Sequence, residues 1–229
     1  MWGVLMDNDA DQVSSIMPGA LLGVLGGGQL GAMFAMAARS MGYRVAVITD
    51  TKDCPAARHA DRLHVGSYTD VSFLTQAAKD LSVVTFEFEN VPAAAGEALK
   101  AEVPDRPCPE VLFTTQNRER EKAFLVDRGI PCGRHAVVRS EKELHNAAGT
   151  IGLPAVLKTA AFGYDGKGQE LIKKTSDLGN AWERLGGATC VLEEWIDFQC
   201  ELSVVAARGL DGAVVAFPAI RNEHKNHIL

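Results

Sequence analysis

The first hundred residues alternate between short apolar runs and amphipathic stretches, which is the rhythm of a β-α-β protein. The apolar runs predict strands at 20–25, 43–50, 62–65 and 82–89. The stretches between them predict helices over 29–41, from Asp70 as N-cap, and over 93–100. Because strands that alternate with helices favour a parallel sheet, this part of the chain is expected to be an α/β domain.

The pattern changes after Pro104. A single long helix is expected from about Glu110 to Arg128, ended by Gly129 and Pro131. The remaining pattern is α+β: strands at 133–139, 154–172 (a pair), 189–195, 201–208 and 213–220, and helices from Ser140 and over 176–184. The last two strands read as an antiparallel hairpin that turns at Leu210-Asp211-Gly212.

Composition narrows the class of protein. The 229 residues are 47% hydrophobic and 23% charged, which is a globular composition. The net charge is −6 and no basic patch accumulates, so neither nucleic acid nor a membrane surface is expected as a partner. The five cysteines are scattered and never form C-x-x-C, which favours the reducing cytoplasm. Residues 1–18 carry no basic n-region and are interpreted as a loose leader.

The first glycine cluster, Gly26 to Gly31, satisfies G-x-G-x-x-G between a strand and a helix. Asp50 ends the next strand, so a dinucleotide site, and with it an NAD(P)-binding oxidoreductase domain, is one interpretation. Another phosphate-bearing ligand and simple turn geometry are the alternatives. Glu87 and Glu89 stand at the carboxyl end of a strand, where ligands bind in open parallel sheets, although such glutamates also often face solvent.

The second glycine cluster, FGYDGKGQ at 162–169, lies between two predicted strands. It does not fit the Walker P-loop pattern. Lys158 ends the preceding strand, so the cluster is either a hairpin connection or a lid that closes over phosphate. Further on, Glu193 and Glu194 followed by Glu201 suit an adenine hinge and a ribose contact, or are simply solvated.

Six motifs together have a more specific meaning. They are GVLGGGQLG at 23–31, TFEFENV at 85–91, QNREREKAFL at 116–125, FGYDGKGQ at 162–169, EEWIDFQCELSVV at 193–205 and NEHKNHIL at 222–229. With them the chain resembles the ATP-grasp superfamily, and within it the family of 5-(carboxyamino)imidazole ribonucleotide synthases. Position 32 is Ala where that family commonly has Arg.

The resemblance implies a fold and its division. An N-terminal, Rossmann-like pre-ATP-grasp domain with a parallel sheet is expected over 19–112. An α+β ATP-grasp domain would follow, with its small subdomain at 113–192 and the start of its large subdomain at 193–229. The family continues beyond this point, so the chain is expected to be a truncated, N-terminal portion of the enzyme, with the Mg²⁺ ligands beyond the present C-terminus.

The resemblance also implies a reaction and its residues. ATP would phosphorylate bicarbonate to carboxyphosphate, whose carboxyl group passes to the amine of 5-aminoimidazole ribonucleotide in purine biosynthesis. Lys158 and Asp165 are the expected catalytic residues. ATP is expected to contact Arg118, Lys158, Gly163, Tyr164, Asp165, Gly166, Lys167, Gly168, Gln169, Glu193, Glu194, Trp195, Ile196, Glu201 and His224. The ribonucleotide is expected to contact Gly27, Gly28, Gln29, Leu30 and Glu89.

The same resemblance makes a homodimer the expected assembly. A non-catalytic nucleotide-binding fragment of the enzyme is an alternative function. The oxidoreductase interpretation leaves residues 154–205 without a role, whereas the ligase interpretation uses both glycine clusters.

Overall fold

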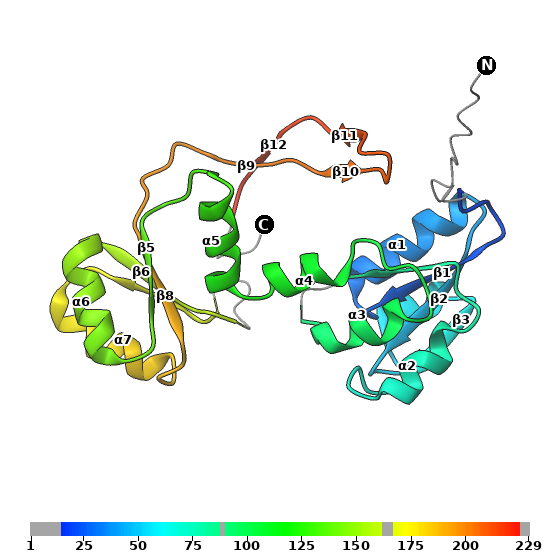
Figure 1. Cartoon of the computed structure of the whole chain (residues 1–229), viewed down its shortest axis with the longest axis horizontal. Helices are drawn as coiled ribbons and strands as arrows, with labels where there is room; N and C mark the ends of the chain where they lie inside the picture. The colour runs from blue at the N-terminus through cyan, green and yellow to red at the C-terminus, as the bar shows by residue number, and fades with distance from the viewer. Residues whose placement is uncertain (1–14, 88–89, 162–166, 225–229) are drawn as a thin grey trace, which may run out of the picture.

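The computed structural model describes residues 15–87, 90–161 and 167–224. Figure 1 shows two lobes that are connected by two consecutive short helices, with an extended arm of short strands near the end of the chain. In the described part of the chain, no helix is both long and apolar enough to span a membrane.

The first lobe is the predicted α/β domain. Its strands form a four-stranded parallel sheet in the order β3-β2-β1-β4. The strands are β1 (Leu21–Leu25), β2 (Arg44–Thr49), β3 (Arg62–Val65) and β4 (Val83–Phe86). The helices are α1 (Gln29–Ser40), α2 (Val71–Ala78), α3 (Ala93–Lys100) and the 3₁₀ turn η1 (Pro55–His59). The parallel sheet and the helical crossovers are confirmed, and Asp70 caps α2 as expected, by accepting a hydrogen bond from the backbone N–H of Phe73.

Both faces of this sheet are covered at its centre, which explains why β1 and β2 are almost entirely apolar. Val24 and Val47 pack with α1 on one face, while Leu25 and Ile48 pack with α2 and α3 on the other. All four side chains are at most 1% exposed. Neighbouring residues of one strand therefore serve different cores.

The first glycine cluster is the turn from β1 into α1. Gly26 has φ 118°, which only glycine adopts without strain. A Cβ on Gly31 would lie 2.7 Å from the Gly26 carbonyl oxygen, so α1 can approach the turn this closely only with glycine there. Two of the three motif glycines are therefore required by the fold itself.

The expected single helix over 110–128 is wrong. It is two helices, α4 (Pro109–Thr115) and α5 (Arg118–Asp127), divided at Asn117. Asn117 has an extended backbone and its side chain accepts hydrogen bonds from the N–H groups of the first turn of α5. The side chain of Gln116 donates to the Val91 carbonyl in the first lobe, and the Arg118 N–H donates to the Ala160 carbonyl in the second. The break thus lies where the chain passes from one lobe to the other.

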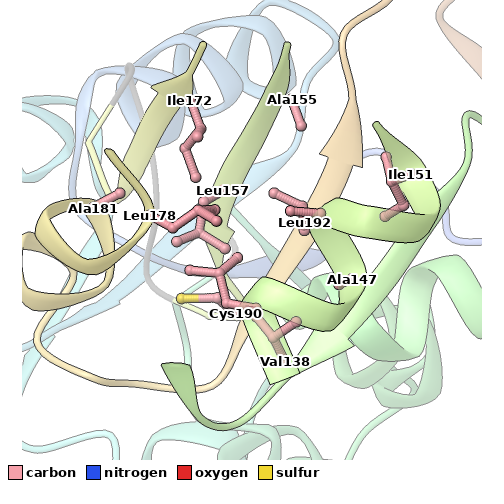
Figure 2. Packing of buried hydrophobic residues seen from close by; sticks show 12 residues of the cluster. Val138, Ala147, Ile151, Ala155, Leu157, Ile172, Leu178, Ala181, Cys190 and Leu192 are labelled. Carbon is pink, nitrogen blue, oxygen red and sulfur yellow. The ribbon is translucent and has the colours of Figure 1, made fainter. Parts of the chain in front are cut away.

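The second lobe is built on a different, antiparallel sheet in the order β5-β8-β6-β7. Its strands are β5 (His135–Val138), β6 (Ala155–Thr159), β7 (Gln169–Ile172) and β8 (Cys190–Glu194). The helices α6 (Glu141–Ile151) and α7 (Leu178–Arg184), the latter preceded by the 3₁₀ turn η2 (Thr175–Asp177), pack on the sheet. Figure 2 shows their core, in which Leu157, Ile172, Leu178 and Leu192 meet.

The start of α6 has the predicted cap in a modified form. Ser140 accepts from the Glu143 N–H, but the Glu143 carboxylate accepts from the N–H of Arg139 rather than of Ser140. Each of the two side chains therefore satisfies one backbone donor at the helix entrance.

The arm after β8 divides the two expected strands into four. β9 (Glu201–Ser203) pairs with β12 (Ile220–Asn222), and β10 (Ala206–Arg208) pairs with β11 (Val214–Ala216), both antiparallel. The predicted hairpin is confirmed, and Gly212 in its turn has φ 84°. None of the described arm residues is buried, and Val215 and Phe217 are both 70% exposed.

Candidate active site

One candidate site is a hollow of about 820 Å³ between the second-lobe sheet and the base of the arm. Strands β6, β7, β8 and β9 all contribute to it. The lining residues are Val156, Lys158, Gln169, Glu193, Glu194, Trp195, Ile196, Phe198, Glu201 and His224. Eight of these ten were expected from the sequence as nucleotide contacts; Val156 and Phe198 were not. Residues far apart in the chain are therefore gathered around one space.

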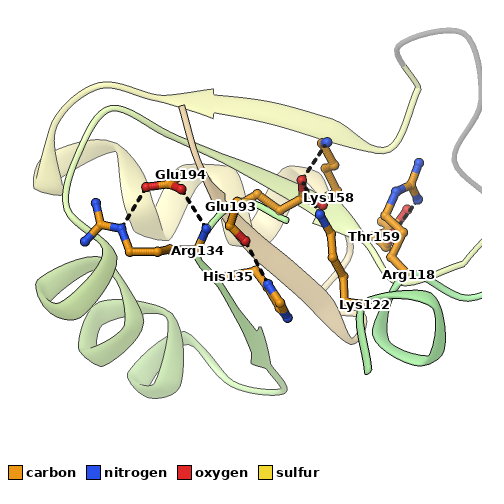
Figure 3. A network of polar contacts seen from close by, with 9 residues as sticks. Arg118, Lys122, Arg134, His135, Lys158, Thr159, Glu193 and Glu194 are labelled. Atoms are coloured by element: carbon orange, nitrogen blue, oxygen red, sulfur yellow. Dashed lines mark hydrogen bonds and ion pairs between the residues drawn. The ribbon is translucent and has the colours of Figure 1, made fainter. Parts of the chain in front are cut away.

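The centre of the polar contacts is the carboxylate of Glu193 (Figure 3). Its Oε2 lies 3.1 Å from Nζ of Lys158 and 3.3 Å from Nζ of Lys122. The side chains of Glu193 and Lys122 are each only 15% exposed. Burial acts to raise the pKa of Glu193, but the two ammonium groups outweigh it and the pKa lies below its usual value. The carboxylate is charged at neutral pH and shared between two cations.

Glu194 points to the other side of β8 and has a different partner. Its two carboxylate oxygens accept from the backbone N–H and from Nε of Arg134, each at 2.7 Å. These bonds lower the pKa of Glu194. The N–H of Glu194 donates to the Arg134 carbonyl and the N–H of Trp195 to the Pro154 carbonyl. A ligand at this edge would therefore meet other backbone groups of residues 193–196.

The far wall of the hollow comes from the β9–β12 pair. Glu201 Oε1 accepts from the side-chain amide of Asn222 at 2.8 Å and lies 3.6 Å from Nδ1 of His224. Asn222 also donates to the hydroxyl of Ser203. Glu201 and His224 thus reach the site through strand pairing, with Asn222 fixing the carboxylate.

Arg118, the first residue of α5, contacts the carboxyl end of β6. Its guanidinium donates to the Thr159 carbonyl at 2.7 Å. Near the end of the second glycine cluster, Gly168 has φ 68°. Its carbonyl accepts a hydrogen bond from the N–H of Thr159, the last residue of β6. Lys167 is exposed there. The expected contacts Gly163, Tyr164, Asp165 and Gly166 lie outside the described residues.

A second hollow, of about 470 Å³, lies over the first glycine cluster. Gly27 and Gly28 line it together with Asp50, Asp53 and Glu87. Among its described lining residues the acidic side chains have no basic counterpart, which suits an amine or hydroxyl ligand better than bare phosphate.

The remaining expected ribonucleotide contacts are less well placed. Gln29 and Leu30 begin α1 without lining the hollow, and Leu30 is 61% exposed. Glu89 lies outside the described residues. Tyr68, which lines the second hollow, has its pKa raised to about 12 by burial and therefore stays protonated.

Comparison with known proteins covers nearly the whole chain. Residues 20–116 match the model of a ribonucleotide synthetase preATP-grasp domain, and residues 123–229 match that of an ATP-grasp domain. The chain thus combines a preATP-grasp domain with an ATP-grasp domain. The resemblance expected from the motifs and the two-domain α/β fold are confirmed.

Three similar proteins carry closely related names. The N5-carboxyaminoimidazole ribonucleotide synthase of Bacillus subtilis (strain 168) is 41% identical over 214 residues, which are 93% of this chain and 56% of the relative. A solved N5-carboxyaminoimidazole ribonucleotide synthetase in complex with ADP has a TM-score of 0.88 at 38% identity, over 93% of this chain and 56% of that one.

A third relative is the Aspergillus clavatus N5-carboxyaminoimidazole synthase, solved with ADP and 5-aminoimidazole ribonucleotide. Its TM-score is 0.81 at 29% identity, over 90% of this chain and 54% of that one. The chain spans about half the length of these relatives.

Sequence reasoning missed Lys122, Arg134 and Asn222. Each of them contacts a glutamate that the sequence did predict as a site residue, and each is distant from that glutamate in the sequence. The signal for Lys122 was present, because it follows Arg118 by one helical turn and so shares its face of α5. No local pattern could have paired Asn222 with Glu201, since that contact depends on the register of β9 and β12.

Proposed function

We propose that the chain forms the nucleotide-binding part of an ATP-dependent carbon-nitrogen ligase that carboxylates 5-aminoimidazole ribonucleotide with bicarbonate. The observation that supports this most directly is the first hollow, where Lys158, Glu193, Glu201 and His224 meet beside exposed Trp195. The name shared by the relatives supports the choice of substrate.

In this proposal the first hollow holds ATP. Lys158, Arg118 and residues 163–169 neutralise the phosphates, because a cation at the end of a strand and a glycine-rich segment suit phosphate oxygens. Residues 193–196 read the adenine edge with backbone groups. Glu201, held by Asn222, accepts from the ribose hydroxyls, and His224 completes that side.

The second hollow takes the ribonucleotide in the same proposal. Gly27 and Gly28 line it before the start of α1, and its carboxylates accept from the reacting amine and the sugar hydroxyls. Gln29 and Leu30, which begin α1 beside it, stay assigned to the ribonucleotide from the sequence alone. Glu89, Tyr164 and Asp165 complete the assignment from the sequence. ATP would phosphorylate bicarbonate and leave as ADP. The amine would then take the carboxyl group from carboxyphosphate, with inorganic phosphate as the leaving group, so the main task of the protein is positioning and charge neutralisation.

Magnesium belongs to this chemistry, since phosphoryl transfer uses it to neutralise the phosphates. Within the described ranges, no group of three or more His, Cys, Asp and Glu side chains could hold a metal ion. The residues described do not supply a metal site, and no step is assigned to the ion.

Calorimetric titration of the chain with ATP, ADP and NAD tests the nucleotide part. ATP and ADP should bind and NAD should not, and Lys158→Ala should weaken ATP at least about tenfold while leaving adenosine unchanged, because it removes a charge-assisted contact to phosphate. Binding of NAD in preference to ATP would support the oxidoreductase interpretation instead. Phosphate release that depends on both bicarbonate and 5-aminoimidazole ribonucleotide tests the reaction, and its absence despite ATP binding would leave the non-catalytic alternative.

A further inference from the structure

Lys122 has no role in the assignment so far, yet it is one of the least exposed lysines of the site. Its Nζ lies 3.3 Å from the same Glu193 oxygen that Lys158 contacts at 3.1 Å. It stands on α5 one turn after Arg118, whose guanidinium and N–H both donate to carbonyls at the end of β6. α5 buries none of its described side chains completely, so polar contacts such as these, together with the Glu119–Arg139 ion pair, attach the helix to the second lobe.

The shared oxygen creates a competition when phosphate arrives. Lys158 can approach a phosphate fully only by loosening its bond to Glu193, whose carboxylate is largely buried. A buried carboxylate that loses its only cation is strongly destabilised. With Lys122 in place, Glu193 keeps one ammonium partner while Lys158 turns to the nucleotide.

We propose that Lys122 is a positioning residue that keeps Glu193 paired, so that Lys158 is available to the phosphates. The inference rests on the proposed function, since it takes the first hollow as a nucleotide site. Lys122 does not touch the nucleotide in this arrangement, and it acts through Glu193 alone.

The test compares ATP and adenosine affinities by calorimetry for the 229-residue chain and its variants. Lys122→Met should weaken ATP about tenfold or more and leave adenosine within about threefold, because only the phosphates compete for Lys158. Lys122→Arg should restore ATP binding, since it keeps the cation. Lys142→Met, which removes an exposed lysine from α6 of the same lobe, is the matched control and should change neither affinity.

A double variant, Glu193→Gln with Lys122→Met, distinguishes a positioning role of Lys122 from direct electrostatic attraction between Lys122 and the phosphates. In the Glu193→Gln background no buried carboxylate needs a cation, so adding Lys122→Met should change ATP affinity by less than about threefold. A full loss in that background would mean that Lys122 attracts phosphate directly, and the proposal would be overturned. Equal weakening of ATP and adenosine by Lys122→Met would make Lys122 purely structural, which overturns it as well.

The two proposals can fail separately. If the unmodified chain binds ATP and Lys158→Ala weakens it, but Lys122→Met has no effect, only the role of Lys122 is wrong. If the unmodified chain does not bind ATP, the nucleotide site and the role of Lys122 both fail. Far-ultraviolet circular dichroism of each variant detects unfolding. Lys122→Gln, which also removes the cation, replaces Lys122→Met in both comparisons if Lys122→Met does not fold.

Discussion

Two adjacent glutamates of β8 have entirely different ion-pair partners. Glu193 and Glu194 follow each other on β8, so their side chains leave the strand in opposite directions. Glu193 meets Lys158 and Lys122, whereas Glu194 holds Arg134 at the start of β5. The sequence predicted a site at this pair but could not separate the two roles, because each depends on a partner brought close only by the fold.

Asp105 is a second residue whose environment has a measurable consequence. It is 2% exposed, both carboxylate oxygens are without a hydrogen-bond partner among the described residues, and it lies beside Val84 at the edge of the first sheet. Burial raises its pKa to about 7, and the nearby Glu97 adds to this. The native state therefore binds a proton that the unfolded chain releases above its ordinary pKa of 3.8.

We predict that this proton makes stability fall as pH rises. Between about pH 4 and 7 the free energy of unfolding should decrease by up to about 1.4 kcal/mol per pH unit from this group, and it should lose no more above the folded pKa. Asp105→Asn removes the titration, so its stability relative to the unmodified chain should increase over the same range. Urea denaturation at about pH 5 and about pH 8 measures the difference, and a difference that does not change with pH would contradict the prediction.

Gly28 can be replaced without backbone strain. Its φ of −72° is available to any residue, so its backbone does not require glycine. A Cβ there would lie 2.6 Å from Oε1 of Glu87, so Gly28→Val should push that carboxylate out of the second hollow. We predict about tenfold weaker binding of 5-aminoimidazole ribonucleotide, on the scale of one lost charged hydrogen bond, with ATP affinity unchanged.

Calorimetric titration with each ligand tests the Gly28 prediction. Gly28→Ala places the same Cβ against Glu87 without the two methyl groups of valine, so it should also weaken the ribonucleotide, by no more than Gly28→Val does. Weakening of ATP to the same extent would mean that the two hollows are not independent.

At the scale of elements, most of the fold could be predicted from local patterns. The apolar runs and the caps at Asp70 and Ser140 predicted strands and helices that are present, because capping and periodicity are local. The break between α4 and α5 was missed, since continuing helical periodicity concealed Asn117 as a cap. The division of the arm into four short strands was also missed, because pairing register is not local.

The Asn117 cap should matter for both stability and binding. Asn117→Ala leaves the first N–H groups of α5 without an acceptor, which should cost about 0.5–2 kcal/mol. Because α5 carries Arg118 and Lys122, ATP should also bind a few-fold more weakly. Asn117→Asp retains an acceptor at the helix N-terminus and should preserve both properties. Urea denaturation and calorimetry measure them, and equal destabilisation by Asp and Ala would show that the side-chain cap is not the cause.

At the scale of the whole molecule, the two lobes have separate hydrophobic cores. The buried clusters of the first lobe lie between Val24 and Leu112, and that of the second between Val138 and Leu192. The α4–α5 junction connects them, and Figure 1 shows the two sheets well apart. The arm adds exposed apolar side chains and no buried ones among its described residues, so it should contribute little to the stability of either core.

We therefore predict that the lobes unfold in two transitions in scanning calorimetry at low protein concentration. Leu157→Ala empties a fully buried position of the second core and Ile48→Ala one of the first, so each should cost its own lobe about 2–5 kcal/mol and lower only one transition. If ATP binds the first hollow as proposed, it should raise only the transition that Leu157→Ala lowers, because a ligand stabilises the unit that holds its site. A single transition that both variants lower and ATP raises would show instead that the α4–α5 junction couples the two lobes into one folding unit.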